Sequence, residues 1–233
     1  MPTEKTEKKV PQLDGRLAAA AAFVRPGAVL ADVGTDHAYL PIALLKEGKI
    51  RSAIASDIAE GPLSRARAHA EGCGMADRIT TVLCDGLDGL EAFHPTDITV
   101  CGMGGELIAS ILGAAPWVKA ETVRLILQPM TMQPVLRKWL YANCFRIETE
   151  ALAKANGRIY PVLCCSYCGE RTVLSDADAY FGGWLLAHPA SSPLFSEYIE
   201  AKRAQLLSIR DGKRIAGLPT DAEDELLSAV PHM

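Results

Sequence analysis

Short apolar runs alternate with longer segments of helical periodicity from residue 28 to about residue 167. The runs are rich in β-branched residues and predict strands at 28–33, 52–57, 79–84, 97–101 and 122–127. Apolar residues spaced three and four apart predict helices at 38–47, 62–72, 105–112 and 132–142. This alternation is typical of βαβ units, so we expect an α/β protein with a mostly parallel, buried sheet.

The pattern changes after the fifth strand. Two further strands follow the last helix, at 144–152 and 158–167, with a turn at Gly157 between them. This order predicts an antiparallel hairpin at the end of the sheet. Because Pro161 has no N–H for the ladder, it indicates a later start or a bulge in the last strand. Five parallel strands with a terminal hairpin are the plan of Rossmann-like methyltransferases, whereas a classical dinucleotide-binding domain has a sixth parallel strand.

Helical segments flank the sheet region on both sides. Residues 10–24 form an alanine-rich helical run, and residues 176–216 are helical in pattern with a break at 188–193. We therefore expect a sheet domain at 10–170 and a small helical domain at 171–233. The helix near 195–214 carries an excess of positive charge, and the segment after it is acidic. Its basic residues are Lys202, Arg203, Arg210, Lys213 and Arg214.

The composition indicates a folded chain. Of 233 residues, 49% are hydrophobic and 22% are charged, which excludes a disordered or low-complexity protein. No apolar run reaches about 18 residues and the charged start lacks the apolar centre of a signal peptide, so we expect a cytoplasmic protein without a membrane partner. A net charge of −4 lacks the basic excess common in nucleic-acid binders. Any RNA contact therefore requires a local basic patch.

The cysteines predict neither disulfides nor a metal site. The chain has 7 cysteines, an odd number, mostly within apolar runs, as expected of reduced thiols. The cluster of Cys164, Cys165 and Cys168 has no second cysteine pair or histidine pair near it in the sequence. We interpret it as part of a strand and expect no metal.

The turn after the first strand is the first candidate ligand site. In open α/β sheets this turn lies where ligands bind, and Gly34 lets a ligand approach the backbone. A dinucleotide-binding turn needs three glycines, but Asp36 stands in place of the second. Its carboxylate would repel a pyrophosphate and favour a cation such as the sulfonium of S-adenosylmethionine. Alternatively, Thr35 or Asp36 only caps the next helix and Asp32 only ends a strand. We interpret His37 as a capping or ligand-facing imidazole rather than a general base.

The next two strands also end in acidic residues. Asp57, followed by Ile58, stands where a carboxylate accepts both hydroxyls of a ribose, in NAD as well as in S-adenosylmethionine. Asp85 can accept from an adenine amino group, and Gly86 allows the ring to lie close. Each of these aspartates can also be an ordinary turn residue.

The fourth and fifth strands end in glycines and an amide. Gly102, Gly104 and Gly105 remove side chains where two substrates would meet, and Met103 can offer a soft apolar wall. The helix N-terminus here could instead hold a phosphate. Gln128 offers a donor and an acceptor at the same edge of the sheet. The alternative for Gln128 is an exposed loop amide.

These motifs together resemble the bacterial tRNA (adenine-22, N1) methyltransferase family. The resemblance spans about residues 13–167 and rests on DVGTDHAYLP (32–41), SDIAEGPLSRA (56–66), CDGL (84–87), GMGGELI (102–108), LILQPM (125–130) and LRKWL (136–140). It implies a class I methyltransferase with a helical C-terminal domain, S-adenosyl-L-methionine as methyl donor and tRNA as acceptor. It further places the cofactor turn at Asp32, Gly34, Asp36 and His37, the ribose at Asp57, the adenine at Asp85 and Gly86, and the methyl group beside Gly102 to Gly105.

The chain departs from the family pattern at three points. The family's S-x-R-L stretch is Asp14-Gly15-Arg16-Leu17 here, and its L-Q-P-N stretch ends in Met130. The helical region is also shorter than is usual in the family, which affects RNA docking more than cofactor binding.

The implied reaction requires no strong base. Adenine N1 carries an in-plane lone pair, so catalysis consists of alignment and electrostatics, for which we select Asp36 and Gln128. For the RNA phosphates we select Arg16, Lys138 and the basic residues of the helix near 195–214, against the alternative of solvated helix faces. Two other functions stay open, namely a small-molecule methyltransferase and a noncatalytic nucleotide- or RNA-binding module on the same fold.

Overall fold

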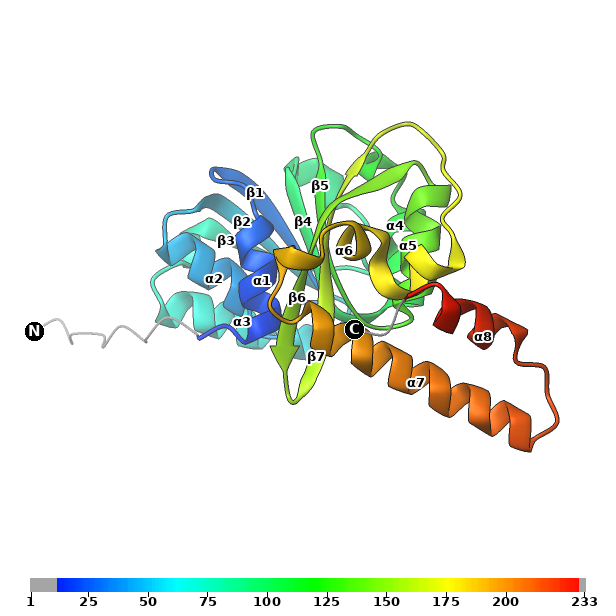
Figure 1. The fold of residues 1–233 in the computed structure, drawn as a ribbon. Helices are drawn as coiled ribbons and strands as arrows, with labels where there is room; N and C mark the ends of the chain where they lie inside the picture. Colours follow the sequence, from blue (N-terminus) through cyan, green and yellow to red (C-terminus); the bar gives the residue numbers. More distant parts are fainter. Residues whose placement is uncertain (1–11, 231–233) are drawn as a thin grey trace, which may run out of the picture.

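The computed structural model describes residues 12–230 and contains one sheet of seven strands in the order β3-β2-β1-β4-β5-β7-β6 (Figure 1). The first five strands pair in parallel and β7 runs antiparallel to β5 and β6. The mostly parallel sheet with a terminal antiparallel hairpin is therefore confirmed. The strands are β1 Ala28–Val33, β2 Ile50–Asp57, β3 Ile79–Leu83, β4 Asp97–Gly104, β5 Arg124–Thr131, β6 Phe145–Ala155 and β7 Arg158–Tyr167.

Five helices belong to the sheet region, each close to a predicted position. They are α1 Gly15–Phe23, α2 Tyr39–Lys46, α3 Glu60–Gly72, α4 Gly105–Ala114 and α5 Gln133–Ala142. The main difference from the sequence prediction is that β4 and β5 continue to Gly104 and Thr131 instead of ending at 101 and 127. The β4 extension leaves the interior, because β4 is buried to Val100 and its last four residues are only partly covered or exposed. The β5 extension stays buried through Gln128 and Pro129 and leaves the interior only at Met130 and Thr131. The apolar run therefore marks the buried part of β4, whereas in β5 the run stops at the polar Gln128 although the strand is still buried there.

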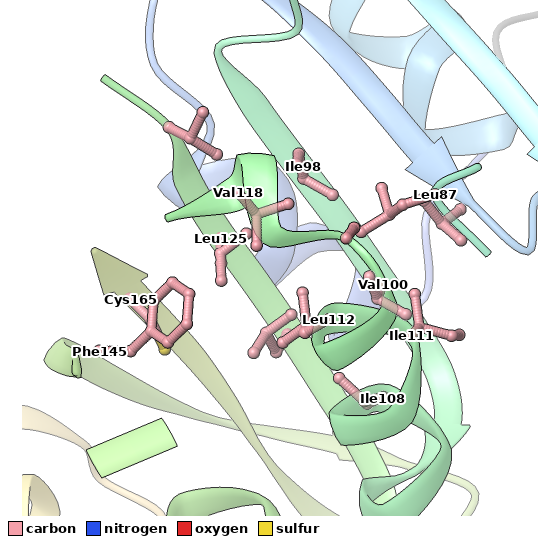
Figure 2. Packing of buried hydrophobic residues seen from close by; sticks show 14 of the residues in the cluster. Leu87, Ile98, Val100, Ile108, Ile111, Leu112, Val118, Leu125, Phe145 and Cys165 are labelled. Carbon is pink, nitrogen blue, oxygen red and sulfur yellow. The ribbon is translucent and has the colours of Figure 1, made fainter. Parts of the chain in front are cut away.

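The sheet is covered on both faces, because neighbouring residues of each central strand point to opposite sides. Leu125 and Leu127 of β5 belong to the core beneath α4 and α5, whereas Ile126 belongs to the core beneath α1, α2 and α3. Figure 2 shows the first of these cores, in which Ile108 and Leu112 of α4 pack on the strands. Burial on both faces explains the continuous apolar runs in the sequence.

The terminal hairpin differs from the prediction at Pro161. The last strand does not start late, and Pro161 lies within it, opposite Leu152 of β6. The register shift of the hairpin lies between Ile147 and Thr149 of β6. The ladder between β7 and β5 ends at Leu163, before the proline is reached. Both parts of the expectation were wrong, because Pro161 lies beyond the part of the strand that pairs with β5.

The C-terminal region is helical, as expected. It contains a π-helical turn, η4, at Asp178–Gly182, then α6 Gly183–Ala187, α7 Phe195–Ile215 and α8 Asp221–Ser228. Its core is shared with the sheet, because Leu152 of β6 packs with Phe181, Tyr198 and Leu206. The division of the chain at residue 170 stays a prediction, and residue 10, where the first domain was expected to begin, lies outside the described residues.

A buried ion pair joins this helical region to the sheet. Arg137 of α5 and Glu150 of β6 are both fully buried, with Nη2 and Oε2 2.6 Å apart. Arg137 Nη1 also donates to the carbonyl oxygen of Ala179 at 2.9 Å. Gly182 makes room for the pair, because a Cβ there would lie 2.9 Å from Arg137 Nη2. The guanidinium thus holds α5, β6 and the π-helical turn together.

Among the described residues, no helix combines the length and the apolar character that crossing a membrane requires.

Candidate functional site

The acidic strand ends and the glycine turns meet at one edge of the sheet. The chain order reverses between β1 and β4, and the carboxyl ends of the five parallel strands face the crevice at this point. The turn after β1 is attached to β2, since the N–H groups of Gly34 and Thr35 donate to the carbonyl oxygen of Ser56 at 2.8 and 3.0 Å. Two backbone hydrogen bonds therefore hold this turn against the end of β2.

Asp32 is buried at the base of this crevice. Only 8% of it is exposed, and its Oδ1 accepts a hydrogen bond from Thr99 Oγ1 at 2.7 Å. Burial raises the pKa of the Asp32 carboxyl, against the opposing effect of the hydrogen bonds from Thr99 and Thr35. Thr35 Oγ1 in turn accepts the N–H of Ala38 at 3.1 Å, a bond within the turn before α2. The N-cap residue of α2 is Ala38, which has no side-chain cap, so the alternative that Thr35 or Asp36 caps this helix is wrong.

We expect Asp32→Asn to raise the free energy of unfolding at pH 7 by about 0.5–2 kcal/mol. A raised pKa in the folded state means that the ionised carboxylate costs stability above that pKa. The difference in free energy of unfolding between Asp32→Asn and the wild type should shrink as the pH falls through the pKa of Asp32 in the folded state towards its pKa in the unfolded state. Urea denaturation between pH 4 and pH 8 measures this difference, and a variant that is less stable than the wild type at pH 7 contradicts it.

Gly34 and Met103 bring the first and fourth strand ends into contact. Gly34 has φ +73°, and a Cβ on it would lie 2.1 Å from Met103 Cε. A side chain at residue 34 would therefore be strained and would displace the methionine. The two glycine motifs of the sequence thus form one surface.

Asp36 and His37 lie on the outer side of the turn. Asp36 pairs with Arg65 of α3 and, at 3.1 Å, with His37 Nε2, and 61% of its side chain is exposed. The hydrogen bond from Arg65 is the main cause of the lowered pKa of Asp36. The His37 ring stacks with Tyr39 and His69, at centroid distances of 4.9 and 5.1 Å. Arg65 therefore already compensates the charge of Asp36, and the role of Asp36 beside a cationic ligand stays a prediction.

Asp57 and Asp85 keep acceptor groups at the edge of the crevice. Asp57 Oδ1 accepts the N–H of Ala59 at 2.9 Å, while the neighbouring Ile58 is 70% exposed. Asp85 is exposed and lines a cavity of about 480 Å³ between the loop after β3 and α4. Gly86 has φ +58°, and a Cβ on it would lie 3.1 Å from Ile111 Cγ2. This side of the site thus presents both acidic and apolar groups.

The glycines after β4 have different structural roles. Gly102 has φ +81° and its N–H donates to Gln128 Oε1 at 3.1 Å. A Cβ on Gly104 would meet Thr131 Oγ1 at 3.3 Å, and one on Gly105 would meet the carbonyl oxygen of Met132 at 2.3 Å. Gly105 is therefore needed for the close approach of α4 to the chain after β5, whereas Gly102 shapes the turn at the site.

Gln128 is fully buried, so the alternative of an exposed loop amide is wrong. Its Oε1 accepts from Gly102 and also from Arg16 Nη1, at 3.3 Å, and its Nε2 donates to the carbonyl oxygen of Pro129. Arg16, which we selected for RNA contact, thus lies at the inner edge of the site and pairs with Asp14 at 2.6 Å. Asp14 caps α1 by accepting two backbone N–H bonds, which a serine at this position would also do.

The basic residues selected for RNA contact are mostly paired with carboxylates. Lys138 pairs with Asp176, Lys213 with Glu223, Arg210 with Asp211 and Asp224, and Arg214 with Asp224. Arg203 is only 9% exposed, and its Nη1 donates to the carbonyl oxygens of Leu227 and Val230. We therefore correct its expected role, because Arg203 fastens α8 to α7. The acidic segment seen in the sequence is α8, which neutralises the end of α7.

Sequence reasoning missed two partners that define the site. Thr99 holds the buried Asp32, and its only signal was a hydroxyl in the middle of an apolar strand. Arg65 neutralises Asp36 from a helix 29 residues away, which no local pattern indicates. Within residues 12–230, no group of three or more His, Cys, Asp or Glu side chains is arranged to hold a metal ion.

The chain resembles known methyltransferases along most of its length. A family model described as a methyltransferase domain matches residues 13–163. The tRNA (adenine(22)-N(1))-methyltransferase of Bacillus subtilis is 35% identical over 175 residues, 75% of this chain and 73% of that protein.

Solved structures agree with this relationship. A Streptococcus pneumoniae protein in complex with S-adenosyl-L-methionine is 36% identical, with a TM-score of 0.80 over 93% of this chain and 100% of that one. M. capricolum TrmK in complex with S-adenosyl-homocysteine is 26% identical, with a TM-score of 0.73 over 86% and 88% of the two chains. Because the fold, the motifs and these similarities coincide, the chain belongs to the tRNA (adenine(22)-N(1))-methyltransferase family of methyltransferase-domain proteins.

Proposed function

We propose that the protein transfers the methyl group of S-adenosyl-L-methionine to N1 of adenine 22 in tRNA. The observation that carries the proposal is the 35% identity with the Bacillus subtilis enzyme, whose name states this reaction. A cytoplasmic location follows from the tRNA acceptor and is part of the same proposal.

The residues at the strand ends fit S-adenosyl-L-methionine. At Gly34 the backbone carries no side chain and Met103 packs against it. Asp57 Oδ2 is left for the ribose hydroxyls, while Oδ1 caps the next turn. Ile58 offers an exposed apolar face to the adenine, and Asp85 offers an acceptor beside Gly86. We assign Asp32 and Thr35 to the support of this turn, His37 to its outer side, and Gly102, Met103 and Gly104 to its inner wall. When bound, the cofactor supplies an electrophilic methyl group.

The task of the protein side chains is alignment. Adenine N1 attacks with its own lone pair, so no residue has to remove a proton first. Gln128 fixes the Gly102 turn and the Arg16 side chain at the edge where the base would enter. Because N1 lies on the base-pairing edge, the nucleotide must be unpaired or extruded from its helix, at a cost of a few kcal/mol.

Incubation with methyl-labelled S-adenosyl-L-methionine and unmodified tRNA tests the proposal. We expect label in 1-methyladenosine after nucleoside analysis, and no label in a matched tRNA that carries guanosine at position 22. Label at another adenine contradicts the position, and transfer only to small molecules contradicts the RNA acceptor.

We expect Asp57→Ala to weaken the binding of S-adenosyl-L-methionine by about 1–3 kcal/mol, because charge-assisted hydrogen bonds to the ribose are lost. Isothermal titration calorimetry measures this effect. Asp77→Ala is the matched control, since Asp77 is exposed in the turn before β3, outside the site. Equal affinities of wild type and Asp57→Ala contradict the assignment.

A further inference from the structure

A cavity of about 470 Å³ lies between α7, the end of β5 and the turn of the β6–β7 hairpin. We call it the α7 cavity. Its apolar wall includes Met130, Met132 and Ile159, and its polar wall includes Gln133, Arg158 and Lys202. Its volume lies within the range of pockets that hold small organic ligands, about 300–1,000 Å³.

The charged groups of the α7 cavity favour an anion. Within residues 12–230, neither Lys202 nor Arg158 lies within ion-pair distance of a carboxylate. Glu197, the one acidic residue in the cavity wall, is already neutralised by Lys154 at 2.6 Å. The lining therefore carries two uncompensated positive charges.

Lys202 lacks a carboxylate partner within residues 12–230, unlike most of the other basic residues selected on α7. Arg210, Lys213 and Arg214 pair with α8, and Arg203 is buried against backbone carbonyls. Lys202 Nζ donates to Gln133 Oε1 at 3.2 Å and lies 4.9 Å from the centroid of the Tyr180 ring. An ammonium group has three N–H donors, so donors remain for a ligand.

The α7 cavity is one layer of side chains away from the reaction site. Met130 forms part of its wall, and Met130 Sδ lies 3.0 Å from Arg16 Nη1. Arg16 contacts Gln128, which holds the turn at Gly102. Gln133 also connects the two regions, because it accepts from Lys202 and donates to the carbonyl oxygen of Met130.

We propose that the α7 cavity binds a nucleotide next to the methylated adenine, with its phosphate on Lys202 and Arg158 and its base against Met132 and Ile159. The inference rests on the proposed function, because only a polymeric acceptor places a second nucleotide so close to the first. An extruded adenine loses its stacking on both sides, and a neighbour held in the cavity keeps the RNA strand in the open form. Lys202 is then a residue that positions the RNA.

The test compares the Lys202→Met and Lys202→Arg variants in steady-state tRNA methylation. Lys202→Met keeps the aliphatic stem and removes the charge, so we expect the KM for tRNA to rise about tenfold, the loss expected for one charge-assisted hydrogen bond. The slope of log affinity against log salt should flatten by about one unit. The affinity for S-adenosyl-L-methionine should stay unchanged, and Lys202→Arg should retain most of the tRNA affinity.

Two further variants separate the site effect from folding and from overall charge. Arg158 lies at the exposed start of β7. Arg158→Gln should therefore raise the KM for tRNA, as Lys202→Met does, without affecting the core. Lys119→Met removes one charge from an exposed position after α4 and should leave the KM unchanged.

The pH dependence provides an independent measurement. Burial, assisted by the nearby Arg137, lowers the pKa of Lys202 to about 8. The groups that face Lys202 are Arg137 of α5, Gln133 at the start of α5, Tyr180 of η4 and Tyr198 of α7, and burial raises the pKa values of both tyrosines. Affinity of the wild type for tRNA should therefore fall as the pH rises from 7 to 9, and Lys202→Arg should abolish this fall.

The possible outcomes are distinct. If the wild type methylates tRNA while Lys202→Met and Arg158→Gln keep its KM and salt slope, the inference is wrong and the proposed function stands. If the wild type methylates no tRNA, the proposed function fails and the inference fails with it.

Discussion

Replacing Arg137 by methionine is expected to lower the free energy of unfolding by about 3–5 kcal/mol, the cost of leaving one charge of a buried pair unpaired. Glu150 would keep its carboxylate at 0% exposure without a partner, and the carbonyl oxygen of Ala179 would lose its donor. Burial lowers the pKa of Arg137, but the attraction of Glu150 outweighs it, so the pKa of the guanidinium is raised and the charge persists at every ordinary pH. Urea denaturation followed by circular dichroism measures the loss.

The double variant Arg137→Met/Glu150→Leu is the control for this prediction. It removes both charges, so we expect it to recover most of the lost stability, as replacement of buried ion pairs by apolar residues often does. Surface pairs such as Lys154 with Glu197 provide the comparison, since breaking one costs about 0–1 kcal/mol. A single variant as stable as the wild type would show that the pair does not fasten the helical region.

Replacing Gln128 by alanine is expected to lower kcat for tRNA methylation about 100-fold, because a displacement of about 1 Å at a reacting centre is sufficient for such a loss. The N–H of Gly102 and the Arg16 guanidinium would both lose their shared acceptor. β4 already departs from regular pairing between Cys101 and Met103, so the turn depends on this acceptor. The affinity for S-adenosyl-L-methionine should change much less, since Asp57 ends β2 and Asp85 follows β3.

The variant Gln128→Glu distinguishes positioning from direct contact with the base. Its carboxylate keeps an acceptor for Gly102 and for Arg16, so we expect it to retain more activity than Gln128→Ala. Gln12→Ala is the matched control, because Gln12 is exposed and precedes α1. Equal loss in Gln128→Glu and Gln128→Ala would indicate that the amide itself touches the base, and unchanged kcat in Gln128→Ala would contradict both roles.

The ion pairs between α7 and α8 make charge reversal on α7 a poor test of RNA binding. Exchange of Arg210, Lys213 and Arg214 for glutamate would place like charges against Glu223 and Asp224 of α8. The loss of binding would then include the detachment of α8. Lys202 and Arg158 avoid this ambiguity because they have no carboxylate partner within residues 12–230.

The sequence by itself determined the sheet and the location of the site. Strands buried on both faces require continuous apolar runs, so β1 and β7 could be located to the residue. Chain order also brings the carboxyl ends of parallel strands to one edge, so Asp32, Asp57 and Asp85 could be expected together. Both inferences depend on local periodicity and chain order, which a sequence displays directly.

Only the tertiary structure decided which charges are already compensated. Asp36 meets Arg65 from another helix, and Lys213 meets Glu223 across a helical hairpin. Gln128 accepts a hydrogen bond from Arg16, which lies 112 residues away in the chain. Such pairings depend on the distance between side chains that are remote in sequence and on the water excluded around them. The periodicity of a sequence shows neither these distances nor the exclusion of water. The structure was therefore needed to distinguish residues that face a ligand from residues that stabilise the fold.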